Sequence, residues 1–221
     1  MEYLMNYLSN QKVLKAFNYA KKMHEGQLRR DGTPYIEHPL RVANYVARFE
    51  GFKNIEILIV SALLHDTIEN TNTTYYDIEN LFDYAVANIV EELTIDEEKR
   101  KEVGKEKYLE TKMEKMTNWA LIIKLCDRLD NTSDLTTSNE EFRDRYSKET
   151  IDVLTYVVNN RPLTTTHIEI IEQIINNIAQ VQNPDNETKL QSISEALTQL
   201  EPTSPNDIPK MKILTPVTKK S

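Results

Sequence analysis

Two histidines and two aspartates stand at positions where the neighbouring residues predict buried helix. His38 begins one predicted helix, and Asp127 lies inside another. His65 and Asp66 are adjacent within the most apolar segment of the chain. Burial of an unpaired carboxylate is strongly unfavourable, so each of these groups needs a partner. One divalent cation would satisfy all four, and a mixture of imidazole and carboxylate suits Mn²⁺, Fe²⁺ or Zn²⁺ better than Ca²⁺.

Each of these residues has a simpler interpretation when taken alone. A lone His38 or His65 is more often a hydrogen-bonded structural histidine, and Asp127 beside Arg128 is more often half of an ion pair. The four together, in the order His, His-Asp, Asp, favour a metal site. Adjacent helical residues project about 100° apart, so His65 and Asp66 would reach one ion only from the edge of the buried face.

The elements that must position these side chains are predicted to be helices. Val13, Phe17, Ala20 and His24 repeat at helical spacing, and a loop over 25–36 follows, carrying Arg29 and Arg30. The next helix should begin near Glu37, with Pro39 tolerated in its first turn. Further helices are predicted over 55–70, 119–129, 140–158 and 164–181. Another should begin at a cap formed by Thr74 or Asp77 and continue to Leu93. The charge-dense segment 94–117 is expected to form a solvated helix.

This pattern predicts an all-α helical bundle with an extended C-terminal tail. Residues 1–182 are expected to form the functional domain, and 183–221 a short helix followed by a flexible tail. The tail is predicted from four prolines among polar neighbours, namely Pro202, Pro205, Pro209 and Pro216.

Composition excludes several classes of function. The 221 residues include only 4 glycines, which disfavours a glycine-rich phosphate loop and a doubly wound fold. A net charge of −8 argues against nucleic acid as a partner but allows a small anion in a locally basic pocket. No apolar run is long enough to span a membrane, and the first residues do not resemble a signal peptide. The single cysteine, Cys126, indicates a reducing cytoplasm. Whether the chain forms a homo-oligomer is left open.

Three segments carry a resemblance to a known family. Residues 27–39, 63–71 and 123–131 contain His38, the pair His65-Asp66, and Asp127, in the order that marks HD-domain phosphohydrolases. Their surrounding residues resemble the small alarmone hydrolases of the RelA/SpoT homologue family, over roughly residues 10–160.

The resemblance implies an Mn²⁺-dependent hydrolase that removes the 3′-pyrophosphate of (p)ppGpp, the alarmone of the stringent response. Carried over by motif position, the metal ligands would be His38, His65, Asp66 and Asp127. The catalytic positions would be Glu69 and Asn70, and the substrate-binding residues Arg29, Arg30, Lys124 and Asn131. Lys124 has an equally good interpretation as the partner of an acid in an ion pair.

The chain departs from the family pattern at two places. Asn70 stands where a second acid is typical, so a role shared by two acids falls to Glu69. Asp130 stands where a histidine is common, and Ser133 and Asp134 replace basic and hydroxyl residues. These departures leave two alternatives open. One is a phosphatase for NADPH or another nucleotide on the same metal site, and the other is a non-catalytic nucleotide-binding module.

Overall fold

The structure, a computed structural model, describes residues 1–49, 54–181 and 183–204. Over these ranges the regular secondary structure is helical, with two isolated β-bridges, which confirms the predicted all-α class. None of the described helices is both long and apolar enough to cross a membrane. The chain divides into two compact units, which meet in sequence between Asp96 and Glu97. Three prolines of the predicted tail, Pro205, Pro209 and Pro216, lie outside the described residues.

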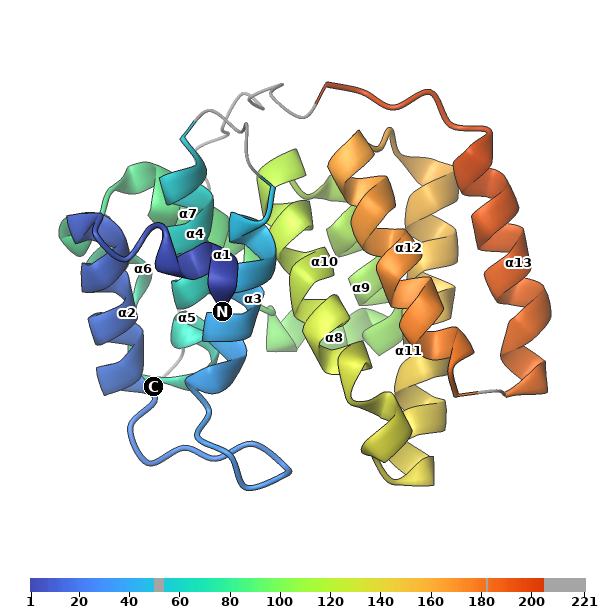
Figure 1. Ribbon diagram of the computed structural model, residues 1–221, viewed down its shortest axis with the longest axis horizontal. Helices are drawn as coiled ribbons and strands as arrows, with labels where there is room; N and C mark the ends of the chain where they lie inside the picture. The colour runs from blue at the N-terminus through green and yellow to red at the C-terminus, as the bar shows by residue number, and fades with distance from the viewer. Residues whose placement is uncertain (50–53, 182, 205–221) are drawn as a thin grey trace. The chain divides into compact units, whose positions relative to one another are not determined.

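Unit 1 is organised around α4, whose residues from Leu58 to Leu64 are all buried. This segment is apolar on every side, and it packs against α2, α3 and α7 (Figure 1). The helices of unit 1 are α1 (Glu2–Met5), α2 (Gln11–Met23), α3 (Glu37–Ala47), α4 (Ile55–Leu64), α5 (Thr67–Asn70), α6 (Tyr75–Leu81) and α7 (Tyr84–Leu93). A helix without a polar face must be surrounded by other helices, which explains its central place.

The single helix predicted over 55–70 is wrong, because α4 ends at Leu64 and α5 begins at Thr67. Two side chains bond the last carbonyls of α4 and so end it. The Thr67 hydroxyl donates to Leu64 O at 2.7 Å, and His65 Nδ1 bonds Ala62 O at 2.8 Å. The His65-Asp66 pair therefore occupies the turn between two helices instead of a helix interior.

The helix expected to reach Leu93 is also interrupted. Thr74 caps α6 in a capping box with Asp77, as predicted, but α6 ends at Leu81. Asp83 then caps α7 by accepting a hydrogen bond from Val86 N at 3.0 Å. Apolar periodicity continues through this break, which is why the pattern alone does not reveal it.

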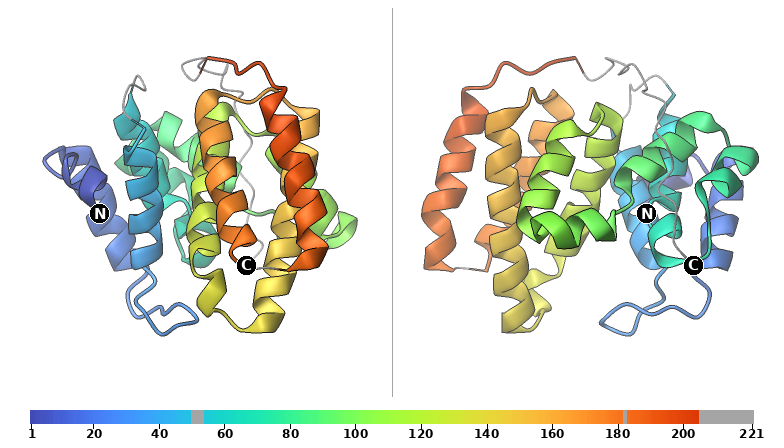
Figure 2. Two further views of the ribbon diagram at one scale, coloured as in Figure 1. Left: turned by 45° about the vertical axis from the view of Figure 1, so that its right-hand side comes forward. Right: turned by 180° about the vertical axis from the view of Figure 1, so that it is seen from behind.

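Unit 2 contains α8 (Glu97–Val103), α9 (Lys105–Lys115), α10 (Asn118–Ser133), the short 3-10 helix η1 (Leu135–Thr137), α11 (Glu140–Asn160), α12 (Thr165–Ala179) and α13 (Pro184–Thr198). α11, α12 and α13 run side by side in both views of Figure 2, and α10 packs on α12. The charged segment 94–117 forms two helices, divided at Gly104, whose φ of +85° lies in the region that favours glycine. The proposed domain boundary at residue 182 stays a prediction.

His167 illustrates how unit 2 satisfies a buried polar side chain. Its Nδ1 accepts a hydrogen bond from Thr164 N at 3.1 Å, and its Nε2 donates to Asn118 O at 3.0 Å. Burial, reinforced by nearby Arg161, lowers the pKa of His167 to about 4. With both ring nitrogens bonded to the backbone of unit 2, His167 has a structural role.

We expect His167 to make stability depend on pH. His167 has a pKa of 6.5 in the unfolded chain and about 4 in the folded chain. Below pH 6.5 the unfolded chain therefore binds a proton that the folded chain does not. The free energy of unfolding is highest above pH 6.5 and falls as the pH is lowered toward 4. The free energy of unfolding should drop by about 2 kcal/mol between pH 7 and pH 5 from this residue. Urea unfolding at these two pH values should show a smaller drop in His167→Gln. An equal drop in both proteins would contradict the assignment.

Candidate metal site

His38 is placed by the start of α3. It is the second residue of this helix and Pro39 is the third, where the missing N–H of proline loses no helical hydrogen bond. The His38 side chain is buried, and its ring lies edge-on to that of His65, with centroids 5.2 Å apart. The predicted beginning of this helix is confirmed, and it brings the first candidate ligand to the turn that follows α4.

His65 presents a nitrogen that lacks a partner. Because a carbonyl oxygen only accepts, the bond to Ala62 O places the hydrogen on Nδ1 and leaves a lone pair on Nε2 in the neutral ring. This Nε2 is buried and has no hydrogen-bond partner among the described residues. Buried polar atoms in proteins nearly always have a hydrogen-bond partner, so a buried acceptor without one calls for an explanation such as a bound ion. A histidine whose second nitrogen is held by a backbone carbonyl is oriented as metal-binding histidines usually are.

Asp66 brings carboxylate oxygens to both histidines. Its Oδ1 lies 3.3 Å from His65 Nε2, and its Oδ2 lies 3.8 Å from His38 Nε2. The Tyr35 hydroxyl donates to Oδ2 at 2.6 Å. The lone pair of His65 and a carboxylate oxygen repel each other unless a positive charge lies between them. The three side chains therefore fit a divalent cation of the kind that nitrogen and oxygen ligands prefer.

Asp127 lies on one face of α10 with two polar neighbours. Its Oδ2 forms an ion pair with Lys124 Nζ at 2.8 Å, and its Oδ1 accepts a hydrogen bond from Asn131 Nδ2 at 2.8 Å. These residues lie three positions before it and four after it, which places them beside it on the helix. Two residues expected to bind substrate therefore bond an expected metal ligand in this structure.

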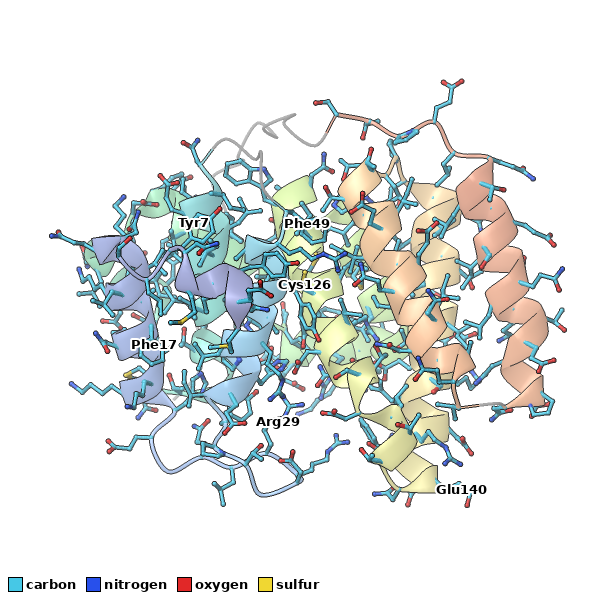
Figure 3. The ribbon with its side chains drawn as sticks, viewed as in Figure 1. Tyr7, Phe17, Arg29, Phe49, Cys126 and Glu140 are labelled. Atoms are coloured by element: carbon cyan, nitrogen blue, oxygen red, sulfur yellow. The ribbon has the colours of Figure 1, made fainter. Side chains whose placement is uncertain are left out.

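The residues beside Asp127 have structural roles. Arg128 turns the other way, bonding Thr150 Oγ1 at 2.9 Å and Glu149 Oε1 at 3.3 Å. Cys126, also on α10 (Figure 3), is fully buried, and burial raises the pKa of its thiol. It is therefore a core residue and not a nucleophile.

The two positions assigned to catalysis both have partners within unit 1. Glu69 Oε2 accepts a hydrogen bond from Ile95 N at 3.2 Å, just beyond the end of α7. Asn70 Nδ2 donates to the Tyr35 hydroxyl at 3.0 Å. The bonds of Tyr35 to Asp66 and Asn70 were not predicted from the sequence. The available signal was its position three residues before His38.

The loop that carries Arg29 joins α2 to α3 (Figure 3). It is turned by paired backbone bonds, with Arg29 N donating to Thr33 O at 2.8 Å and Gly32 N donating to Arg29 O at 3.0 Å. Arg29 is half-buried and Arg30 exposed, so the turn presents two cations beside the segment that begins α3.

His24, at the end of α2, packs beneath this loop. Its ring stacks on that of Tyr35 with centroids 4.8 Å apart, and its Nδ1 bonds Gln27 Oε1 at 2.8 Å. Burial lowers the pKa of His24, and the bond to Gln27 offsets only part of that effect. The bond to Gln27 therefore ties the end of α2 to the loop that follows it.

Comparison with known proteins identifies the family. A family profile described as an HD domain matches residues 16–162. This chain belongs to the HD domain family. The matched range includes His65 and Asp66, the adjacent pair in the turn between α4 and α5. Members of this family bind a divalent metal, and the buried lone pair of His65 facing Asp66 agrees with that expectation.

Two relatives of this HD domain carry names that refer to guanosine-3′,5′-bis(diphosphate). A Xenopus tropicalis protein named guanosine-3′,5′-bis(diphosphate) 3′-pyrophosphohydrolase MESH1 is 42% identical over 125 residues, which are 56% of this chain and 69% of the relative. An Aquifex aeolicus protein named guanosine-3′,5′-bis(diphosphate) 3′-pyrophosphohydrolase is 37% identical over 155 residues, which are 65% of this chain and 20% of that relative. The matched part of the chain thus spans about a fifth of the length of bacterial relatives such as the Aquifex aeolicus protein.

A solved structure extends the similarity to the fold. It is described as a metazoan orthologue of SpoT that hydrolyses ppGpp and plays a role in starvation responses. The match has a TM-score of 0.57 at 25% sequence identity and covers 84% of this chain and 95% of the other. The HD domain is therefore recognisable both in sequence and in the course of the chain.

Proposed function

We propose that this chain is a metal-dependent hydrolase that converts ppGpp to GDP and pyrophosphate. The observation that carries the proposal is the buried Nε2 of His65, which accepts no hydrogen bond from the described residues and lies 3.3 Å from Asp66 Oδ1, in an HD domain. The names of its relatives supply the substrate, since the Xenopus tropicalis protein shares 42% of the aligned residues. Hydrolysis of a phosphoanhydride or phosphoester at neutral pH needs an activated water, which this type of site supplies.

We assign four metal ligands, His38, His65, Asp66 and Asp127, and Mn²⁺ as the metal. The first three converge within unit 1, and motif order supports the fourth. When bound, the divalent cation lowers the pKa of a coordinated water and polarises a phosphoryl oxygen. The paired imidazoles favour Mn²⁺ over the harder Ca²⁺.

The remaining assigned residues would bind the substrate and move the proton. Glu69, held at one oxygen by Ile95 N, accepts a proton from the attacking water in this proposal. Arg29 and Arg30 pair with the substrate phosphates, which explains how an acidic protein accepts an anion. Lys124 and Asn131, which bond Asp127, contact the phosphates or the ribose.

A second candidate is a phosphatase that acts on NADPH at the same metal site. Asn70 favours it over a typical alarmone hydrolase, because an amide cannot take a proton and donates here to Tyr35. Its reaction would release inorganic phosphate, whereas ppGpp hydrolysis would release pyrophosphate. The two candidates therefore differ in a product that can be measured directly.

The test compares the purified chain on ppGpp and NADPH, each with Mn²⁺, Mg²⁺ or Zn²⁺. We expect GDP and pyrophosphate in equal amounts from ppGpp, fastest with Mn²⁺. Phosphate from NADPH without pyrophosphate from ppGpp would instead support the second candidate. Binding of both nucleotides with turnover of neither would contradict both and indicate a binding module.

The proposed cellular setting follows from the same chemistry. We place the chain in the cytoplasm, because its single cysteine is a buried core residue that forms no internal disulfide. Removal of ppGpp there would oppose the stringent response.

A further inference from the structure

The HD aspartate is held by a tyrosine from the preceding loop. The Tyr35 hydroxyl lies 2.6 Å from Asp66 Oδ2, a short charge-assisted hydrogen bond. The Tyr35 ring is fixed by its neighbours, since it stacks on His24 and lies edge-on to His38 at 6.2 Å. A ring held on these sides can direct its hydroxyl at one carboxylate oxygen.

The direction of this bond can be deduced. An ionised carboxylate only accepts, so the Tyr35 hydroxyl donates its one hydrogen to Asp66. The phenolic oxygen can then only accept, and Asn70 Nδ2 donates to it at 3.0 Å. An aspartate at position 70 would accept as well, and the single phenolic hydrogen could not serve two carboxylates. The Asn70 amide donates to the phenolic oxygen and so leaves the phenolic hydrogen for Asp66.

Asn70 is itself held from two sides. It ends α5, where its backbone N–H donates to Asp66 O at 2.9 Å. Its backbone carbonyl accepts from Gln27 Nε2 at 2.9 Å, and Gln27 Oε1 bonds His24 Nδ1. The loop after α2 and the short helix α5 are thus tied together by hydrogen bonds that lead to the HD aspartate.

We propose that Asn70 and Tyr35 are positioning residues that act in sequence on Asp66. Asn70 donates to Tyr35, which commits the phenolic hydrogen to Oδ2 and leaves Oδ1 facing His65 for the metal. The assignment gives Asn70 a specific task, which is to donate to the phenolic oxygen that holds Asp66. It rests on the proposed function only in taking Asp66 as a metal ligand, and it is independent of the substrate.

Direct measurement of Mn²⁺ binding tests this inference. Titration of the metal-free full chain with Mn²⁺, followed by electron paramagnetic resonance of the free ion, gives the affinity without any substrate. Tyr35→Phe and Asn70→Leu should each weaken Mn²⁺ binding about tenfold, which is the usual effect of losing a group that orients a ligand. If Asn70 acts through Tyr35, the double variant should also lose about tenfold and not a hundredfold.

Tyr19→Phe is the matched control. The Tyr19 hydroxyl also forms a side-chain hydrogen bond, but its partner is Thr73 Oγ1 at 3.2 Å and not Asp66. Its variant should keep wild-type Mn²⁺ affinity, and circular dichroism of all metal-free variants should match the wild type. Unchanged affinity in folded Tyr35→Phe, or additive losses in the double variant, would overturn the inference. Mn²⁺ binding without ppGpp hydrolysis in the wild type would instead refute the proposed function alone.

Discussion

His65→Ala should reduce the rate of pyrophosphate release from ppGpp by about a thousandfold or more. The substitution removes the buried Nε2 that faces Asp66, and with it one of the proposed metal ligands. Activation of water by a metal accounts for most of the rate in such a site, so the loss should appear in kcat and not only in KM. Mn²⁺ binding, measured by the same titration as above, should weaken together with the rate.

His167→Gln provides the matched control for this prediction. His167 is also buried, but its two nitrogens are bonded to Thr164 and Asn118 in unit 2. At pH 7.5 this variant should keep both its Mn²⁺ affinity and its rate of ppGpp hydrolysis. A wild-type rate in His65→Ala would contradict the assignment of the HD histidine, whatever the effect on folding.

Arg128→Ala should lower the free energy of unfolding by about 3–5 kcal/mol, the usual loss when one partner is removed from a buried ion pair. Arg128 is 3% exposed. Its guanidinium bonds Glu149 and Thr150, and it lies 5.7 Å from the centre of the Tyr146 ring. Burial raises the pKa of Glu149, but the charges of Arg128 and Lys105 outweigh burial and hold it below its usual value. Without Arg128, Glu149 would keep its ion pair with Lys105, whose side chain is largely exposed.

Urea unfolding measures this effect, with Arg145→Ala as the control. Arg145 pairs with Glu141 at 3.9 Å, and both side chains are largely exposed. Its loss should change the free energy of unfolding by less than about 0.5 kcal/mol. A combined Arg128→Met and Glu149→Gln variant should recover part of the loss, because it leaves no buried charge unpaired. Equal effects of Arg128→Ala and Arg145→Ala would show that the buried Arg128 ion pair contributes no more to the free energy of unfolding than an exposed pair.

Much of the helical framework could be predicted before the structure was known. The repeat from Val13 to His24 corresponds to α2, and the predicted start at Glu37 is the start of α3. These predictions succeeded because an amphipathic helix carries its period in its own residues. The segment 55–70 failed because an apolar stretch has no such period, and its break depends on the side chains of His65 and Thr67.

Part of the candidate site could likewise be predicted from the sequence, and part could not. Charged and imidazole groups in apolar helices are conspicuous because each needs a buried partner, so His38, His65, Asp66 and Asp127 could be proposed together from the sequence. Their joint role as metal ligands stays a prediction. The direction in which neighbouring side chains point was not predictable, since packing decides it. Lys124 bonds Asp127, whereas Arg128 turns to Glu149.

Composition and periodicity were enough to predict an all-α chain, and the charged groups within apolar segments were enough to propose a metal site, which stays a proposal. They work because helix formation and the burial of charge are governed largely by local sequence. Only the tertiary structure joined Tyr35 to Asp66, 31 residues further along the chain, and Asn70 to Tyr35 across 35 residues. Such bonds depend on how the loop after α2 folds back toward α5, and no local pattern encodes that approach.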